Sequence, residues 1–218
     1  MSPMPPATNA GTAARGPIGA VVLAAGAATR MGTAKALLPI AGRPMIVRVV
    51  ETLLTAGGFL PIVVITGHQP ELINAALQPF PITVHHNPDY AAGEMLSSLR
   101  VGIEALTDQV AAILLVLADQ PGVHPATLQK LVAHWHTIDT PLLLPSYQGR
   151  RGHPIVLSAQ LFPEIRALPS ARTLRDLVHR HLSPAAQLPV ADPAILWDID
   201  TPEDYRQAVA RWSVLDNP

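Results

Sequence analysis

The sequence predicts a single-domain α/β fold built on a doubly wound, mostly parallel sheet. Several short segments are continuously hydrophobic instead of alternating, which is typical of parallel strands buried on both faces. Segments with helical spacing lie between them, and such strand–helix alternation indicates a doubly wound sheet. The length of 218 residues fits one large domain with a substantial core, and we find no internal repeat. Ligands of such sheets bind outside the carboxyl ends of the strands.

Each predicted element rests on a local pattern. The predicted strands are Ala20–Ala24, Ile62–Thr66, Ala112–Ala118 and Leu142–Leu144, with Ile82–His85 as a shorter, peripheral strand. The predicted helices are Met45–Ala56, Pro70–Leu77, Leu96–Leu106 and Pro125–His134. Gly57-Gly58 ends the first of these helices. A last helix is predicted to begin at Thr201-Pro202-Glu203, with Thr as the N-cap and Pro at the first helical position.

Composition and charge exclude several classes of function. A net charge of −1 argues against non-specific binding of nucleic acid. The longest apolar run, Val110–Ala118, is too short to span a membrane, so we expect no membrane partner. The chain has no cysteine, which excludes thiolate metal sites and cysteine nucleophiles and fits a cytoplasmic location. Met1–Pro17 is rich in small residues and Pro, and we expect it to be a disordered leader before a domain at 18–218.

The loop after the first strand carries the strongest functional pattern. Small residues follow the strand in Leu23-Ala24-Ala25-Gly26, and Arg30, Gly32 and Lys35 come next. Small residues let backbone N–H groups approach phosphate oxygens, and two cations neutralise phosphate charge. The alternative is a tight strand-to-helix turn with solvated cations. Five residues separate Gly26 from Gly32, and Lys35 does not follow Gly32 directly, so the loop is not a P-loop; nor does it hold the dinucleotide-binding glycine pattern.

Two acidic blocks are candidates for metal binding. Asp119 ends an apolar strand, where a carboxylate is well placed to hold Mg²⁺ against phosphates. Asp198 and Asp200 are two residues apart, so in an extended segment their carboxylates point to one side. The alternative roles are a turn or helix cap for Asp119 and a helix start for the second block.

The loop resembles the signature of the MobA-like nucleotidyltransferase superfamily. That signature is Leu-Ala-Ala-Gly, a short spacer, Arg-Met-Gly, two residues, Lys and then Leu-Leu-Pro. Its elements stand here from Leu23 through Lys35 to Pro39, and the likeness continues through Gly42-Arg43-Pro44-Met45. Within the superfamily the chain is most similar to the molybdenum cofactor cytidylyltransferases. The resemblance runs from Gly19 to about Arg211 and implies a Rossmann-like nucleotidyltransferase fold.

The resemblance also implies roles for particular residues. Lys35, Arg30 and Asp119 would be catalytic, and Asp119 and Asp200 would hold Mg²⁺. The nucleotide would be bound by Leu23, Ala24, Ala25, Gly26, Arg30, Lys35, Gly93 and Ser98. His153, in Arg150-Arg151-Gly152-His153-Pro154, would contact the acceptor. The alternatives are a serine-capped helix start for the block at Gly93–Gly102 and a turn histidine for His153.

The implied reaction is transfer of CMP from CTP to the phosphate of molybdopterin, in its metal-loaded form, with release of pyrophosphate. Ala25, at the third place of Leu-Ala-Ala-Gly, resembles the cytidylyl-transferring members, because guanylyl-transferring relatives usually have Gly there. The second alternative is transfer to another phosphate, such as a sugar or polyol phosphate. A third is a carrier that delivers the mature cofactor to a molybdenum hydroxylase.

Overall fold

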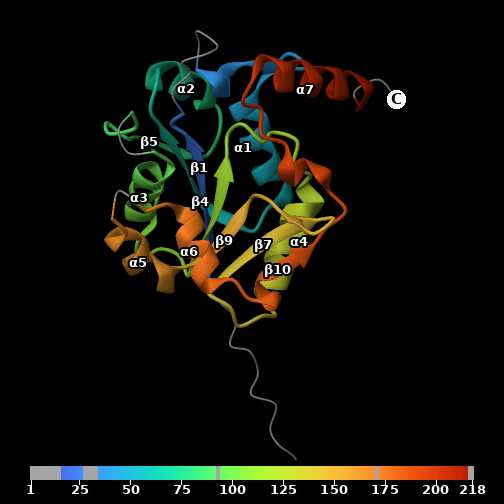
Figure 1. Ribbon diagram of the computed structural model, residues 1–218. Helices are drawn as coiled ribbons and strands as arrows, with labels where there is room; N and C mark the ends of the chain where they lie inside the picture. Colours follow the sequence, from blue (N-terminus) through green and yellow to red (C-terminus); the bar gives the residue numbers. More distant parts are fainter. Residues whose placement is uncertain (1–15, 27–33, 92–93, 170–171, 216–218) are drawn as a thin grey trace, which may run out of the picture.

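A central sheet organises the protein. The computed structural model describes residues 16–26, 34–91, 94–169 and 172–215. The sheet runs in the order β10-β7-β9-β6-β1-β4-β5, and β8 pairs with β7 (Figure 1). Its strands are β1 (Ile18–Ala24), β4 (Phe59–Thr66), β5 (Thr83–His86), β6 (Ala112–Leu117), β7 (Leu142–Tyr147), β8 (Arg150–Arg151), β9 (Ile155–Ser158) and β10 (Gln187–Pro189). All pairings are parallel except those of β9 with β6 and β7, and of β8 with β7. The predicted α/β class with a mostly parallel sheet is therefore confirmed.

The central strands are apolar throughout because both of their faces are buried. In β1, Ala20 and Val22 pack into one hydrophobic core, whereas Val21 and Leu23 pack into the other. The neighbouring strands β4 and β6 divide their residues between the two cores in the same way. This packing is why hydrophobicity does not alternate along these strands.

Helices cover both faces of the sheet (Figure 1). One core joins it to α1 (Met45–Ala56), α2 (Pro70–Leu77) and α4 (Pro125–Trp135). The other joins it to α3 (Glu94–Leu106), α5 (Phe162–Ala167) and α6 (Leu174–His181). As predicted, α1 stops at Gly57, whose φ of 69° is accessible to glycine and whose N–H donates to the Leu53 carbonyl at 3.0 Å.

The C-terminal helix α7 (Pro202–Leu215) lies across the end of the sheet, at the top of Figure 1. It packs on the short hairpin β2 (Pro39–Ile40) and β3 (Arg43–Pro44) through Ile40 and Ala208. The predicted start is confirmed, because the amide of Asp204 donates to Thr201 Oγ1 at 3.1 Å. No helix among the described residues is long and apolar enough to cross a membrane.

The α-helices and strands that were not predicted are β2, β3, β8, β9, β10, α5 and α6. The strand β9 has only four residues and follows directly on His153-Pro154, so it offers little pattern. The short helices α5 and α6 lie in a stretch of scattered charges and histidines. In α6 the apolar residues Leu174, Leu177 and Val178 are buried, and their i, i+3, i+4 spacing was the available signal.

Candidate active site

Three predicted site residues meet at the carboxyl ends of β1 and β6. Lys35 Nζ lies 2.5 Å from Asp119 Oδ2 and 2.8 Å from Asp200 Oδ1. Lys35 opens a 3-10 turn (Lys35–Leu37), and Asp119 follows β6 after one intervening residue. The Lys35 pKa is raised: burial lowers it, but the charges and hydrogen bonds of the two carboxylates outweigh that effect. The ammonium thus bridges the two acidic blocks.

A backbone hydrogen bond fixes the second acidic block beside the first. The amide of Ile199 donates to the Asp119 carbonyl at 3.2 Å, and the Ile199 side chain is buried under α7. Asp198 and Asp200 flank Ile199, so both carboxylates face away from that core, as the two-residue spacing predicted. Asp198 Oδ1 accepts a hydrogen bond from Gln120 Nε2 at 2.5 Å. Desolvation, with the charges of Asp119 and Asp200, raises the Asp198 pKa.

The cluster has the donors that a divalent cation needs. Asp119 Oδ1 is buried and has no hydrogen-bond donor in the described part of the chain. An unpaired buried carboxylate oxygen is costly unless a cation or another ligand meets it. The described residues contain no group of three or more acidic or histidine ligands, so phosphate and water would complete the coordination, as is usual for Mg²⁺. Asp119 and Asp200 therefore fit a two-carboxylate magnesium site.

A pocket of about 260 Å³ adjoins Asp119 on the side of β1. It is lined by Leu23, Ala25, Gly26, Tyr90, Met95, Ser98, Leu117 and Asp119. Four predicted nucleotide-binding residues, Leu23, Ala25, Gly26 and Ser98, thus line one pocket. The side chain of Ala24 points into the opposite core, so only its backbone faces this side of the sheet.

The Ser98 side chain is hydrogen-bonded to Asn87, and Ser98 lies inside its helix rather than at the N-cap. Because α3 begins at Glu94, Ser98 lies in the second turn. Its Oγ accepts from Asn87 Nδ2 at 2.9 Å, and the same nitrogen donates to Ser97 Oγ at 2.8 Å. The buried Asn87 also accepts from the Asp89 amide at 3.0 Å. These bonds tie the loop after β5 to α3 at the pocket wall.

Gly67, just after β4, allows the chain to pass close behind the pocket. A Cβ atom placed there would stand 2.5 Å from Tyr90 Cγ and 2.7 Å from the Ala25 carbonyl oxygen. Any side chain at Gly67 would therefore displace two residues that line the pocket.

His153 lies near enough to Asp119 for the carboxylate charge to act on its imidazole. Its amide donates to the Ile195 carbonyl at 3.0 Å, which anchors the loop between β8 and β9. Burial lowers the His153 pKa, although the negative charge of Asp119 opposes the shift, so the imidazole is neutral at pH 7. His153 lines a cleft of about 750 Å³ that also reaches Met95 and α6. Met95 lines both this cleft and the smaller pocket, so the two spaces adjoin.

The sequence profile of the MobA-like NTP transferase domain matches residues 20–185, which include this arrangement except Ile195 and the block Asp198–Asp200. The chain belongs to the MobA-like NTP transferase family. It is 28% identical over 201 residues to the molybdenum cofactor cytidylyltransferase of Escherichia coli K12, with 91% of this chain and 98% of the relative covered. It is also 36% identical over 158 residues to a nicotine blue oxidoreductase of Paenarthrobacter nicotinovorans, with 66% of this chain and 72% of the relative covered.

Solved structures agree with the sequence comparison. The crystal structure of Rv0371c from Mycobacterium tuberculosis H37Rv is 30% identical, with a TM-score of 0.75 and 89% of this chain and 98% of that chain covered. A structure of Rv0371c in complex with manganese is 29% identical, with a TM-score of 0.72 and the same coverage.

Some predicted site residues of this MobA-like protein lie outside the described part of the chain, and some residues at the site were not predicted. Arg30 and Gly93 lie outside the described residues. Asn87 and Gln120 were not predicted. The signal for Asn87 was its place directly after β5, which matches the place of Asp119 near the end of β6.

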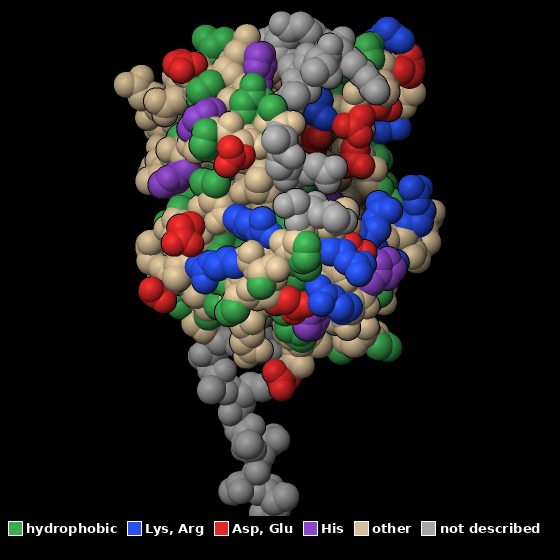
Figure 2. Space-filling model, turned by 60° about the vertical axis from the view of Figure 1, so that its left-hand side comes forward, with side chains coloured by type: hydrophobic (Ala, Val, Ile, Leu, Met, Phe, Trp, Pro, Cys, Tyr) green, Lys and Arg blue, Asp and Glu red, His purple; other side chains and the backbone are tan. Residues whose placement is uncertain are grey.

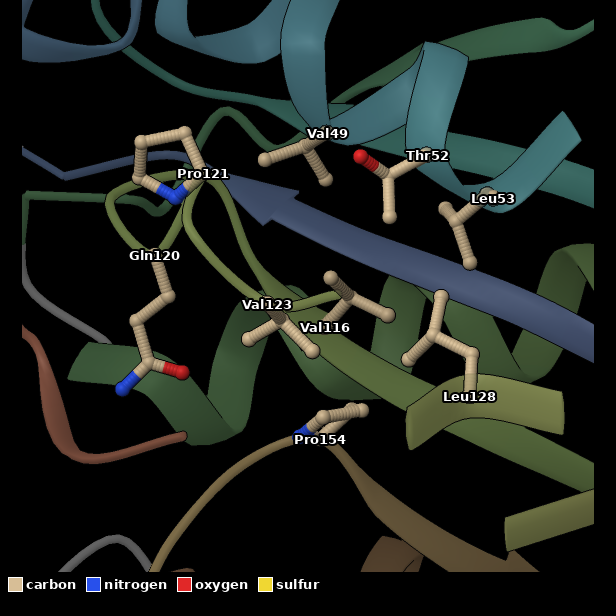
Figure 3. Close-up of a pocket in the computed structure, with 9 residues that line it drawn as sticks. All are labelled: Val49, Thr52, Leu53, Val116, Gln120, Pro121, Val123, Leu128 and Pro154. Atoms are coloured by element: carbon tan, nitrogen blue, oxygen red, sulfur yellow. The ribbon is translucent and has the colours of Figure 1, made fainter. Parts of the chain in front are cut away.

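A small gap lined mostly by apolar side chains lies near the site of the MobA-like protein (Figure 3). It holds about 10 Å³ under the loop after β6, enough for at most about one water. The close-up shows the Gln120 amide directed away from the apolar side chains around the gap. The apolar side chains of that loop thus pack around the gap, while the Gln120 side chain donates its hydrogen bond to Asp198.

Proposed function

We propose that the protein transfers CMP from CTP to the phosphate monoester of molybdopterin, in its metal-loaded form, in a Mg²⁺-dependent reaction. The observation that carries this proposal is the bridge from Lys35 Nζ to Asp119 and Asp200, at 2.5 and 2.8 Å. One cation and two carboxylates at the meeting point of a small pocket and a larger cleft suit the joining of two phosphates.

The proposed reaction needs no side-chain nucleophile. An oxygen of the acceptor phosphate attacks the α-phosphorus of CTP, and a new P–O–P linkage forms. The bond from the α-phosphorus to the bridging oxygen of the β-phosphate breaks, and pyrophosphate leaves with the electron pair. A phosphate monoester is largely ionised at pH 7, so no base has to remove a proton. Positioning and charge stabilisation can then supply most of the rate.

Each residue has a defined task in this scheme. Asp119 and Asp200 would hold Mg²⁺, which when bound offsets phosphate charge. Lys35 would turn from the carboxylates to the phosphates of donor and acceptor, and Arg30 would favour departing pyrophosphate. Neutral His153 would hydrogen-bond the acceptor. Backbone amides at Ala25 and Gly26 would hold the nucleotide, with Gly93 and Ser98 at the base or ribose.

The choice of CTP rests on the pocket and on one relative. The Ala25 methyl takes up space at the edge of the pocket of about 260 Å³, where glycine would leave more room for a purine. The cytidylyltransferase of Escherichia coli aligns over 91% of this chain.

The test is pyrophosphate release with each of the four NTPs, with molybdopterin and then with sugar and polyol phosphates as acceptors. We expect CTP with molybdopterin to give the fastest release, and EDTA to stop it until Mg²⁺ is restored. A protein that only carries the cofactor would release no pyrophosphate. A protein with the activity named for the Paenarthrobacter relative would instead turn over a redox substrate.

A further inference from the structure

The cleft beside His153 is far larger than a phosphate requires. We call it the basic cleft and define it by Arg150, Arg151, His153, Arg175 and His179. Its volume of about 750 Å³ lies in the range of sites for whole small molecules. Its floor is apolar, formed by Leu144, Ile155, Leu174 and Val178. The cleft can therefore hold an apolar ring system as well as charged groups.

The arginines of the basic cleft are not used by the fold. In the described part of the chain, none of Arg150, Arg151 and Arg175 has a carboxylate or carbonyl partner for its side chain. Other arginines do: Arg43, Arg166, Arg180 and Arg206 each pair with a glutamate, and Arg48 and Arg100 donate to backbone carbonyls. Figure 2 shows Lys and Arg side chains gathered in a band on one face of the molecule.

Helix α6 is fixed so that two basic residues face the cleft. Leu174, Leu177 and Val178 bury one side of α6 in the core. Arg180 and His181 hold it to α5 through Glu164, at 2.9 and 2.6 Å. Arg175 and His179 are four residues apart, so they lie on the same side of the helix, and both line the cleft. The positions of the Arg175 and His179 side chains are therefore set by packing.

We propose that the basic cleft is the acceptor subsite, and that it selects acceptors with a flat ring system, whose faces pack on the apolar floor, and a negative charge additional to the reacting phosphate. Arg175, together with Arg150 and Arg151, holds that additional charge. The reacting phosphate is held by Lys35 and by the metal that Asp119 and Asp200 would bind; Met95 lines both the cleft and the pocket that contains Asp119, so the two spaces adjoin. This inference rests on the proposed nucleotidyl transfer at that cluster, and it assigns specificity to residues that the transfer itself does not use.

The test uses two fluorescent pterins that differ in charge and carry no phosphate. The full chain is titrated with 6-carboxypterin and with neutral 6-hydroxymethylpterin, with and without a non-hydrolysable CTP analogue and Mg²⁺. We expect 6-carboxypterin to bind about tenfold more tightly, as a charge-assisted hydrogen bond predicts. We also expect the preference to persist with the CTP analogue bound and to fall as KCl is raised.

Matched variants locate the recognition. Arg175→Gln, at an exposed position, should abolish the preference for the carboxylated pterin, and Arg151→Gln should reduce it. Arg206→Gln removes a charge from α7, where the side chain pairs with Glu203, and should leave the preference intact. Equal binding of the two pterins, displacement by the CTP analogue, or equal loss in Arg175→Gln and Arg206→Gln would overturn the proposal. Circular dichroism confirms that each variant is folded.

The outcome separates this inference from the proposed function. An Arg175-dependent preference without pyrophosphate release from CTP and molybdopterin would retain the subsite and reject the reaction. If pyrophosphate is released, but the KM for the acceptor is the same in Arg175→Gln and in the unaltered protein, the reaction is retained and the subsite is rejected.

Discussion

Replacing Lys35 with Met should strengthen metal binding while destroying turnover. In the protein without substrate, the Lys35 ammonium bridges the same two carboxylates that would hold Mg²⁺. A metal ion must therefore displace the lysine before it can bind. Met keeps much of the side-chain volume and removes the charge, so the competition disappears.

The size of the effect follows from the two ion pairs. Unit charges about 4 Å apart attract by roughly 1 kcal/mol in water and roughly 4 kcal/mol near a protein surface. Lys35 and Asp119 are each 22% exposed, whereas Asp200 is 63% exposed, so the second pair contributes less. A total of about 1–3 kcal/mol corresponds to about 5- to 150-fold tighter metal binding. Turnover should fall by about 10² or more, because a preorganised charge is lost at the transition state.

The two effects are measured separately. Free Mn²⁺ is followed by electron paramagnetic resonance in the absence of nucleotide, and pyrophosphate release is followed with Mg²⁺ and CTP. Lys130→Met, which removes an exposed lysine from α4, should change neither. If Lys35→Met bound Mn²⁺ no more tightly than the unaltered protein, the lysine would not compete with the metal, and the reasoning would fail.

Four further predictions test the site and one helix. Asp119→Asn should abolish Mg²⁺-dependent activity with little change in Tm; unfolding at room temperature would instead make Asp119 structural. CTP should exceed GTP at least about tenfold in kcat/KM, because a mismatched base leaves buried polar groups unpaired, and Ala25→Gly should narrow that gap; a preference of the unaltered protein for GTP would reject the cytidylyl assignment. Gly67→Ala should cost much more free energy in the binding of CTP, measured as a raised KM, than in folding, measured by calorimetry as a lowered Tm. Asp176→Asn should lower Tm by about 2–4 °C at pH 7. The Thr173 amide donates to Asp176 and holds its pKa below the ordinary 3.8, so its charge stabilises the fold above that value. The Tm deficit should therefore shrink as pH falls below 3.8, and a deficit independent of pH would contradict this role.

The sequence predicted the parts of the fold that burial alone determines. Strands β1, β4 and β6 are apolar on both faces, and continuous hydrophobicity is a strong local signal. The pattern of α6 is weak because five of its eight residues are charged or histidine, and its apolar residues make one narrow stripe. Its role in the cleft depends on packing against distant segments, which no local pattern contains.

The site, like the fold, has some features with a local sequence signal and others that depend on contacts between distant segments. The place of Asp119 was predictable because it directly follows a long apolar run, and ligands of such sheets bind outside the carboxyl ends of the strands. The pairing of Lys35 with both carboxylates was not, because it depends on the approach of segments far apart in the chain. Gln120 and Asn87 act through other side chains, and an amide beside a strand end has many ordinary explanations.

The hydrogen bond from Ile199 to Asp119 has a consequence for synthesis of the protein. Lys35 and Asp200 are separated by 165 residues, and Asp200 is seated only when the segment before α7 docks on the end of β6. On the ribosome, the strands β1, β4 and β6 emerge long before that segment. A nascent chain can thus assemble most of its sheet while it lacks one of the two carboxylates. Under the proposed roles of Asp119 and Asp200, a chain that ends before residue 200 lacks one metal ligand and should bind the metal less tightly than the complete chain.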